Sequence, residues 1–216
     1  MPIIVNQSTS PTGFTLSTLK QSIANRLGRN SLADMLGEFV MLGEARIYNG
    51  WRDIDVQVEP LRIRAMLAIE NQSLSTLPDG FLSVERLTVP DWTGRAPALT
   101  YLTPQEFSKL PPSGCARHYT IADGAVQVEG GQPATFSLSY YRRLLPLAGD
   151  DDTNWILQYA PQVYLYSALI EAYQHIKDDA RLITAARQYA GAVNALIEAD
   201  KLERYSGATL AIGSPR

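Results

Sequence analysis

The sequence is poor in cysteine and histidine and has no excess of basic residues. Its 216 residues include one cysteine, Cys115, and two histidines, His118 and His175. A single thiol excludes an internal disulfide and a cysteine-rich metal site, and it fits a reducing compartment such as a bacterial cytoplasm. Lys and Arg number 19 against 22 Asp and Glu, for a formal net charge of -3. Because proteins that bind nucleic acid usually carry a basic balance or patch, this composition argues against nucleic acid as the main ligand.

Long apolar runs and the common ligand-binding motifs are also missing. No uninterrupted apolar stretch reaches membrane-spanning length, and residues 1–10 have no basic region and too short an apolar run for a signal peptide. The glycine-rich phosphate-binding motifs Gly-x-x-x-x-Gly-Lys-Ser/Thr and Gly-x-Gly-x-x-Gly do not occur. The metal-binding motifs His-Glu-x-x-His and Cys-x-x-Cys are also absent. We therefore expect no membrane partner, no metal and no cofactor.

Histidine and cysteine offer little for nucleophilic catalysis. Cys115 and His118 lie three residues apart, but nucleophile–base pairs form in space and not by local spacing. Ordinary surface or edge positions are favoured for both. His175 lies near the end of an apolar helix, where a protonated imidazole suits the C-terminal dipole.

Acidic residues give two further candidates. Asp150-Asp151-Asp152 lacks the glycine and the spaced acceptors of a calcium loop, so a solvated loop that caps the next helix is favoured. Glu38 and Glu44 are six residues apart on one predicted helix and need not face each other. A hydrolase that uses these carboxylates stays open as an alternative.

The first zone, to about Gly50, is predicted to be helical. Thr15 can cap a helix that Gly28 stops, and Ser31, with Asp34 three residues on, can cap a second helix that ends near Gly50. Two amphipathic helices joined by a short turn are expected to pack antiparallel. The apolar positions are Leu16, Leu19, Ile23 and Leu27 in the first helix and Leu32, Met35, Leu36, Phe39, Leu42 and Ile47 in the second.

The second zone, from about Trp51 to Leu147, contains short alternating runs separated by turn residues. Alternation places one set of side chains in a core and the other in water. Asp123-Gly124 predicts a tight hairpin, and Pro104 opens a short helix. Strands are predicted over residues 62–69, 73–77, 82–89, 98–102, 118–122, 125–128 and 135–141. This zone is interpreted as a small antiparallel β domain of sandwich or barrel type.

The third zone is helical again. Asp152 or Thr153 can cap a short turn, and Pro161 opens a helix to about Lys177 that is apolar on nearly every side. Such a helix is expected to be buried, either centrally or against a neighbouring subunit. The acidic pair at residues 178–179 starts a long helix, and residues 205–216 are interpreted as an extended tail.

The order of helices, strands and helices predicts an α+β fold. The N-terminal and C-terminal helices are expected to form one helical bundle, with a small antiparallel β domain inserted between them. The predicted boundaries are 1–50 and 148–204 for the bundle, 51–147 for the inserted domain and 205–216 for the tail.

Several short motifs follow one another in a characteristic order. They are Leu77-Pro78-Asp79-Gly80-Phe81-Leu82, Ser139-Tyr140-Tyr141-Arg142-Arg143-Leu144, Asp152-Thr153-Asn154-Trp155-Ile156-Leu157, the run from Ala160 to Leu169, and Lys177-Asp178-Asp179. In this order and spacing they resemble the head–tail adaptor family of tailed bacteriophages, also called head-to-tail connectors. Gly80 is an insertion relative to the family's turn and affects only the geometry of that turn. The resemblance covers Leu77 to the C-terminus well and the N-terminal helices more loosely.

The resemblance implies a structural virion protein, not an enzyme, with no catalytic residues to transfer. Adaptors of this kind form a homo-oligomeric ring, commonly twelve-fold, beneath the portal at the head–tail junction. They link the portal protein to a tail or nozzle protein, and DNA passes through their channel only as cargo. Assembly in the host cytoplasm is expected. A virion-associated peptidoglycan hydrolase and a transient assembly scaffold or chaperone remain as alternatives.

A ring of identical subunits needs two different complementary faces on each subunit. The sequence has 11 tyrosines, many of them late in the chain, and tyrosine is common both in cores and at interfaces. We expect Tyr164, Tyr166 and Tyr173 to contribute to subunit packing. The tail is expected to dock on the portal and to order on binding. Its candidate contact residues are Tyr205, Leu210, Ile212 and Arg216.

Overall fold

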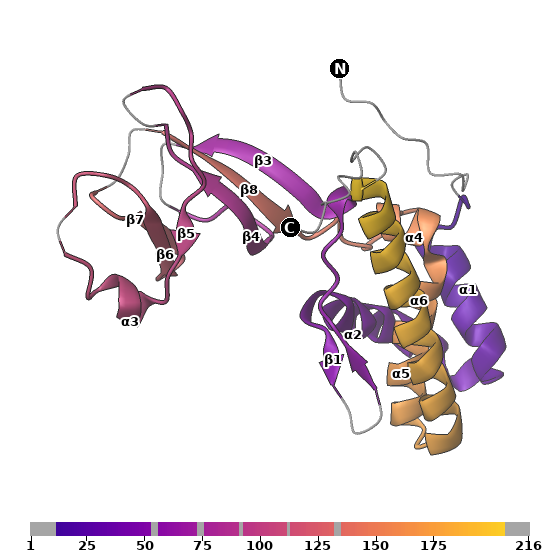
Figure 1. Ribbon diagram of the computed structural model, residues 1–216. Helices are drawn as coiled ribbons and strands as arrows, with labels where there is room; N and C mark the ends of the chain where they lie inside the picture. Colours follow the sequence, from indigo (N-terminus) through magenta and orange to yellow (C-terminus); the bar gives the residue numbers. More distant parts are fainter. Residues whose placement is uncertain are drawn as a thin grey trace, which may run out of the picture. The chain divides into compact units, whose positions relative to one another are not determined.

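The computed structural model describes residues 12–52, 56–72, 76–90, 93–111, 113–131 and 135–205. The chain divides into two compact units, one formed by Met1–Arg64 with Leu144–Arg216 and the other by Ala65–Arg143. Helices from both ends of the chain build the first unit, and small sheets build the second (Figure 1). This arrangement confirms the predicted α+β class, with a β domain inserted into a helical bundle.

Helix α1, Leu16–Leu27, begins and ends where the sequence predicts. Thr15 and Thr18 form a reciprocal capping box, and Gly28 ends the helix in the left-handed conformation with φ 63°. Both features satisfy backbone groups that a helix end leaves without partners. The predicted apolar positions are all buried: Leu16, Leu19, Ile23 and Leu27.

The second helix differs from its prediction at its start. Asn30–Met35 forms a 3₁₀ helix, and α2, Leu36–Asn49, follows it with no side-chain cap. Ser31 is therefore not the N-cap of α2. The reason is that Met35 already has near-helical backbone angles, so the 3₁₀ turn leads directly into α2. Leu42, expected in the apolar face, is 41% exposed.

A small strand pair follows α2 that the sequence pattern does not predict. Gly50 has φ 74°, and a Cβ there would lie 2.7 Å from the carbonyl oxygen of Val58. Only glycine fits this close approach. Strands β1, Trp51–Arg52, and β2, Gln57–Val58, pair antiparallel immediately after it.

Helix α4, Trp155–Tyr159, is capped by Asn154 and not by Asp152 or Thr153. The Oδ1 atom of Asn154 accepts a hydrogen bond from the Leu157 amide at 3.0 Å. The two predicted caps make other contacts, because Asp152 accepts from the amides of Ala148 and Gly149. Thr153 donates to the Phe14 carbonyl at 2.9 Å.

Helix α5, Pro161–His175, is the centre of the helical unit. It packs against α1, α2 and α4 and against α6, Asp179–Tyr205. In Figure 1, α5 and α6 run side by side. The sequence predicts this helix to be buried either centrally or against a neighbouring subunit. Within its own chain, α5 takes the central position.

Two three-stranded sheets form the inserted unit. One has the order β3-β8-β4, with β3 Leu67–Gln72, β4 Phe81–Thr88 and β8 Phe136–Arg142, all antiparallel. The other has the order β5-β6-β7, with β5 Thr100–Tyr101, β6 His118–Ala122 and β7 Ala125–Val128. The β5–β6 pair is parallel, which departs from the antiparallel prediction. The long connection that contains α3, Pro104–Phe107, permits it.

Four of the seven predicted strands are confirmed, the run 98–102 is shortened to β5, and two others differ more. β4, β6, β7 and β8 match their predictions within one residue at each end, and Asp123-Gly124 forms the predicted hairpin with φ of 52° and 71°. The run 62–69 begins instead with a 3₁₀ helix, Arg64–Met66. Of the run 73–77, residues 73–75 lie outside the described residues, and Thr76 forms a single bridge to Ala125.

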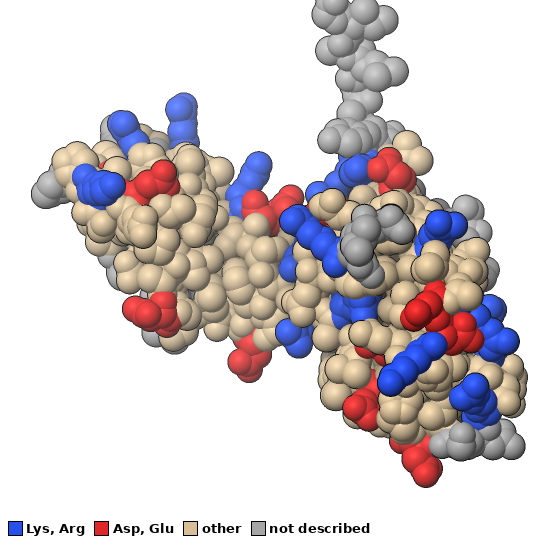
Figure 2. All heavy atoms as spheres, turned by 90° about the horizontal axis from the view of Figure 1, so that it is seen from below, with Lys and Arg blue, Asp and Glu red and all other residues tan. Residues whose placement is uncertain are grey.

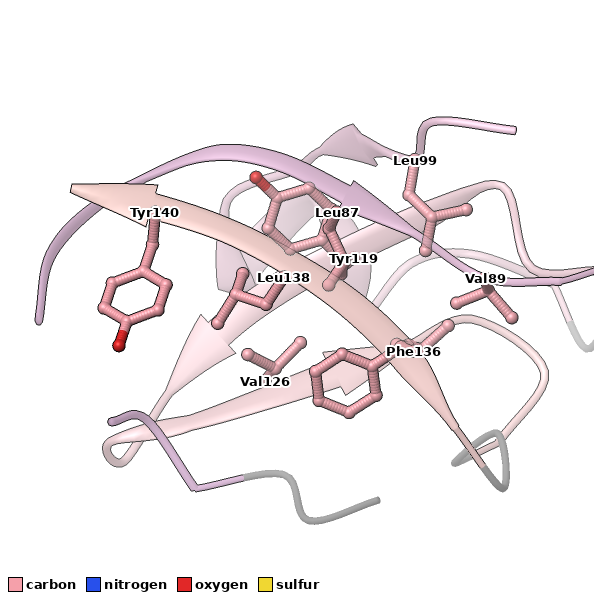
Figure 3. Packing of buried hydrophobic residues seen from close by; sticks show 9 residues of the cluster. Leu87, Val89, Leu99, Tyr119, Val126, Phe136, Leu138 and Tyr140 are labelled. Atoms are coloured by element: carbon pink, nitrogen blue, oxygen red, sulfur yellow. The ribbon is translucent and has the colours of Figure 1, made fainter. Parts of the chain in front are cut away.

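The two sheets share one core. Phe136, Leu138 and Tyr140 alternate along β8 and are buried with Leu87 of β4 and Val126 of β7 (Figure 3). Alternating positions of a strand point to one face, so β8 supplies the central row of this core. The Tyr140 hydroxyl donates to Glu70 at 2.7 Å at the edge of the core.

Candidate functional site

Several of the residues considered for chemistry have structural partners. Within the described ranges, no three His, Cys, Asp or Glu side chains gather as a metal site. Nδ1 of His118 lies 2.7 Å from Oε2 of Glu129, which also accepts from the amides of Arg117 and His118. This hydrogen bonding holds the pKa of the Glu129 carboxyl below its usual value. Cys115 is exposed. His118 thus joins the ends of a hairpin.

The acidic candidates lie apart from one another, in an ion pair, in a loop turn and on α2. Asp150 pairs with Lys20 at 2.7 Å. The Gly149 and Ala148 amides lower the pKa of the Asp152 carboxyl, as expected for a carboxylate that accepts backbone hydrogen bonds. Glu38 is exposed on α2, whereas Glu44 bonds inside the bundle. The two glutamates therefore do not form the facing carboxylate pair that glycoside hydrolysis needs.

A chain of hydrogen bonds crosses the middle of the helical unit. Asn154 Nδ2 lies 2.8 Å from the Tyr164 hydroxyl, which donates to Glu44 Oε1 at 3.0 Å. The Tyr48 hydroxyl donates to the same oxygen at 3.3 Å and accepts from the Leu144 amide at 3.1 Å. Burial raises the pKa of Tyr48 to about 12 and raises that of Tyr164 further above its ordinary value. Buried polar groups of this kind fix one arrangement because each needs its partner.

Helices α2 and α5 approach each other at small residues. A Cβ built on Gly43 would lie 2.7 Å from Ser167 Oγ and 2.9 Å from the Ala168 amide nitrogen. Close to this contact, Arg46 pairs with Glu171, with side-chain exposures of 12% and 15%. The Arg46 guanidinium also stacks over the Trp51 ring at 4.6 Å. The α2–α5 contact is therefore tight and specific.

The points where the chain leaves and re-enters the helical unit are held by α2 and α6. The Arg62 guanidinium donates to the backbone carbonyl of Tyr48 at 3.1 Å, and the Leu144 amide donates to the hydroxyl of the same residue at 3.1 Å. The Arg64 amide donates to Asp200 at 2.9 Å, and its guanidinium to Glu203 at 2.7 Å. Both connections to the inserted unit thus begin from fixed positions in the helical unit.

A groove of about 390 Å³ lies among α1, α5 and α6. Tyr166, Leu169 and Tyr173 come from α5, Arg26 from α1 and Arg181 from α6. The Arg26 guanidinium lies 5.7 Å from the centre of the Tyr166 ring, and Arg181 has Asp178 at 3.5 Å. The remaining lining residues are Thr184, Ala185 and Gln188. We call this surface the α5 groove; it combines aromatic rings with two guanidinium groups.

A second surface runs along the outer side of α2 and the 3₁₀ turn before it. Met41 is 62% exposed and Leu42 41%, and both follow the exposed carboxylates of Asp34 and Glu38. Exposed large apolar side chains grouped on one face are typical of contact surfaces. The full set is Ala33, Asp34, Gly37, Glu38, Met41, Leu42 and Ala45, all exposed. We call this set the α2 stripe.

The tyrosines predicted for subunit packing lie in two different places. Tyr164 has no exposed surface, so its ring and hydroxyl serve the interior. Tyr166 and Tyr173 both line the α5 groove. Tyr205 is the last residue of α6, while Leu210, Ile212 and Arg216 lie outside the described residues.

Sequence reasoning alone finds neither the two arginines of the α5 groove nor the α2 stripe. Arg26 and Arg181 are far apart in the chain, and only the packing of α1 and α6 on α5 brings them to one groove. The positions of the stripe recur every three or four residues along residues 33–45, the period of a helix face, but their exposure is seen only in the structure.

Charges are mixed on the face drawn in Figure 2. Acidic and basic side chains lie next to one another there on each unit, and much of the surface is neither. None of the described helices combines the length and apolar character needed to cross a bilayer. Two helix-lined surfaces, the α5 groove and the α2 stripe, are thus found among the described residues, and the acidic, histidine and cysteine candidates do not come together on either of them.

Comparison with known proteins adds the family. A search of curated proteins finds no match to this chain. A family model described as SU10 adaptor protein matches residues 14–212. The matched range contains all the helices and strands of the described residues and every motif on which the resemblance to phage adaptors rests. The chain therefore belongs to the SU10 adaptor protein family, and this membership implies a structural adaptor role in a bacteriophage particle.

Proposed function

We propose that the chain is a head–tail adaptor, which assembles as a ring beneath the portal and links it to the tail. The ring is expected to have twelve copies, with DNA passing through its channel. Family membership and the ordered motifs from Leu77 to Asp179 support this role. Assembly in the host cytoplasm belongs to the same proposal.

The observation that carries the proposal is the construction of the helical unit. Its central helix α5 is covered by α1, α2, α4 and α6, and buried hydrogen bonds hold α2 and α5 in one arrangement. Such a unit keeps its shape when copies pack side by side. Repetition of one heterologous contact by rotation then closes a ring.

The passage of DNA requires a surface that does not retain it. Binding of duplex DNA is dominated by Lys and Arg contacts to phosphates. The net charge of -3 and the interspersed charges in Figure 2 agree with DNA as cargo.

Portal docking is assigned in this proposal to the C-terminal residues, with Tyr205, Leu210, Ile212 and Arg216 as contacts. A segment that orders on binding can cover a large surface of a partner. The opposite end of the ring would then receive the tail or nozzle protein.

The proposal is tested by mixing the full chain with the portal protein of the same phage and imaging the mixture by electron microscopy. We expect rings seated on one end of the portal. Removal of residues 206–216 should leave the chain folded but abolish this binding. Failure of the full chain to associate with either portal or tail protein would contradict the proposed role, and normal binding by the truncated chain would contradict the docking assignment.

A further inference from the structure

The α5 groove and the α2 stripe lie on opposite sides of the helical unit. On α5, the side facing α2 carries Tyr164, Ser167 and Glu171, whereas Tyr166 and Tyr173 line the groove. Tyr164 and Tyr173 are about two and a half helical turns apart, which places them on opposite sides of α5. The groove therefore opens away from α2.

The same geometry applies to α2. Gly43 faces α5. Met41 and Ala45 are each two positions away from it, about 200° around the helix, and Glu38 falls on the same outer side. The α2 stripe therefore points away from α5, in the direction opposite to the groove.

The two faces are also complementary in chemistry. The groove carries two guanidinium groups, one of them next to Asp178, and an aromatic and aliphatic floor. The stripe carries two carboxylates, Met41 and Leu42, and no basic residue among its members. An amphipathic helix face laid into an apolar groove is a recurrent mode of recognition.

Charge also selects which faces can meet. Two grooves brought together would place arginine against arginine, and two stripes would place carboxylate against carboxylate. Like charges juxtaposed at an interface are strongly unfavourable. Only groove against stripe, a head-to-tail contact between different faces, is favourable in charge.

We infer that the α5 groove of one copy receives the α2 stripe of a second copy of this chain. The contact is heterologous, so rotation that closes gives a ring. The inference rests on the proposed ring, for which it names the subunit interface. Arg26 and Arg181 on one copy face Asp34 and Glu38 on the next.

Cross-linking tests the contact directly. In a Cys115→Ser background, Ala45→Cys and Gln188→Cys place one thiol in the stripe and one in the groove. A bismaleimide should give a ladder of trimers and larger species from the double-cysteine chain, with or without portal protein. Each single-cysteine chain should stop at the dimer at most, because each copy then has one reactive thiol.

Charge reversal tests the pairing. Arg26→Glu with Arg181→Glu, or Asp34→Lys with Glu38→Lys, should each weaken self-association by about tenfold or more. All four changes together should restore it. The matched control, Arg117→Glu with Arg187→Glu, alters two exposed arginines outside both faces and should leave association unchanged.

The outcomes separate this contact from the adaptor role. Rings on the portal without a cross-linked ladder would overturn the contact and leave the adaptor role intact. A ladder without any portal binding would support the contact and contradict the adaptor role; absence of both would contradict both. Duplex DNA that abolishes the ladder, and whose binding requires Arg26 and Arg181, would assign the groove to nucleic acid and overturn the contact.

Discussion

At the scale of single residues, the absence of a side chain at Gly43 determines how closely α2 and α5 approach. The nearest atoms to a Cβ there are Ser167 Oγ and the Ala168 backbone. The serine hydroxyl has some freedom, but the backbone of a central helix cannot withdraw without disturbing its other contacts.

Gly43→Ala is therefore expected to destabilise the chain. Overpacking in a well-packed core typically costs about 1–3 kcal/mol, and the loss should appear in the free energy of unfolding measured with urea. Gly37→Ala is the matched control in the same helix, since a Cβ there meets nothing within 4 Å. It should be neutral or stabilising by up to about 1 kcal/mol. Equal effects of the two changes would contradict the close approach.

At the scale of elements, Asn154 connects two helices. Its Oδ1 caps α4, and its Nδ2 reaches both the Leu145 carbonyl and the Tyr164 hydroxyl of α5. One side chain therefore ends a loop, starts a helix and joins the buried hydrogen-bond chain.

Asn154→Ala should cost more than the loss of a cap alone. An N-cap contributes about 1 kcal/mol, and leaving a buried partner unsatisfied adds about 1–3 kcal/mol. Thr15→Ala, which removes the cap of α1 and an exposed contact with the Ser17 hydroxyl, should cost about 1 kcal/mol. Thermal or urea unfolding compares the two; a smaller loss for Asn154→Ala than for Thr15→Ala would contradict the linking role.

The elements also show how far the sequence predicts the structure. Helices α1 and α5 and the hairpin at Asp123-Gly124 follow from strong local signals. The start of α2 could not be predicted, because a 3₁₀ helix leads directly into α2 and no capping residue separates the two. The predicted caps of α4, Asp152 and Thr153, precede the observed cap Asn154 by one or two residues, because aspartate, threonine and asparagine are all good caps and tertiary contacts decide among them.

The candidate site was only partly predictable for the same reason. The sequence predicts Tyr166 and Tyr173 at a subunit contact, and the structure places both in the α5 groove. Their contact with a second copy of the chain stays a proposal. Tyr164 is also a tyrosine of α5, but its side chain points toward α2. The arginines of the groove come from two other helices, and only the packed bundle brings them together.

At the scale of the whole molecule, buried tyrosines link stability to alkaline pH. Burial raises the pKa of Tyr48 from 10.0 to about 12, and it raises the pKa of Tyr164 and Tyr189 above their ordinary value as well. The folded state keeps protons that the unfolded state loses above pH 10. The stabilising contribution of these groups is thus fully present below about pH 10 and is lost as the pH rises through the folded pKa values.

The free energy of unfolding should therefore fall between about pH 10 and pH 12. Each such tyrosine contributes a slope of up to about 1.4 kcal/mol per pH unit. Urea unfolding at a series of pH values measures it, and Tyr48→Phe should reduce the slope in this window. A stability that stays constant to pH 12 would contradict the buried state of these phenols.

The central claim is that the chain is a lasting structural part of a phage particle, in a ring between portal and tail. Electron cryomicroscopy of the mature particle of its phage tests this most directly. We predict density for the α5-centred helical unit beneath the portal, repeated around the channel with groove against stripe. Mature particles that lack this chain would indicate a transient scaffold or chaperone and would contradict the claim.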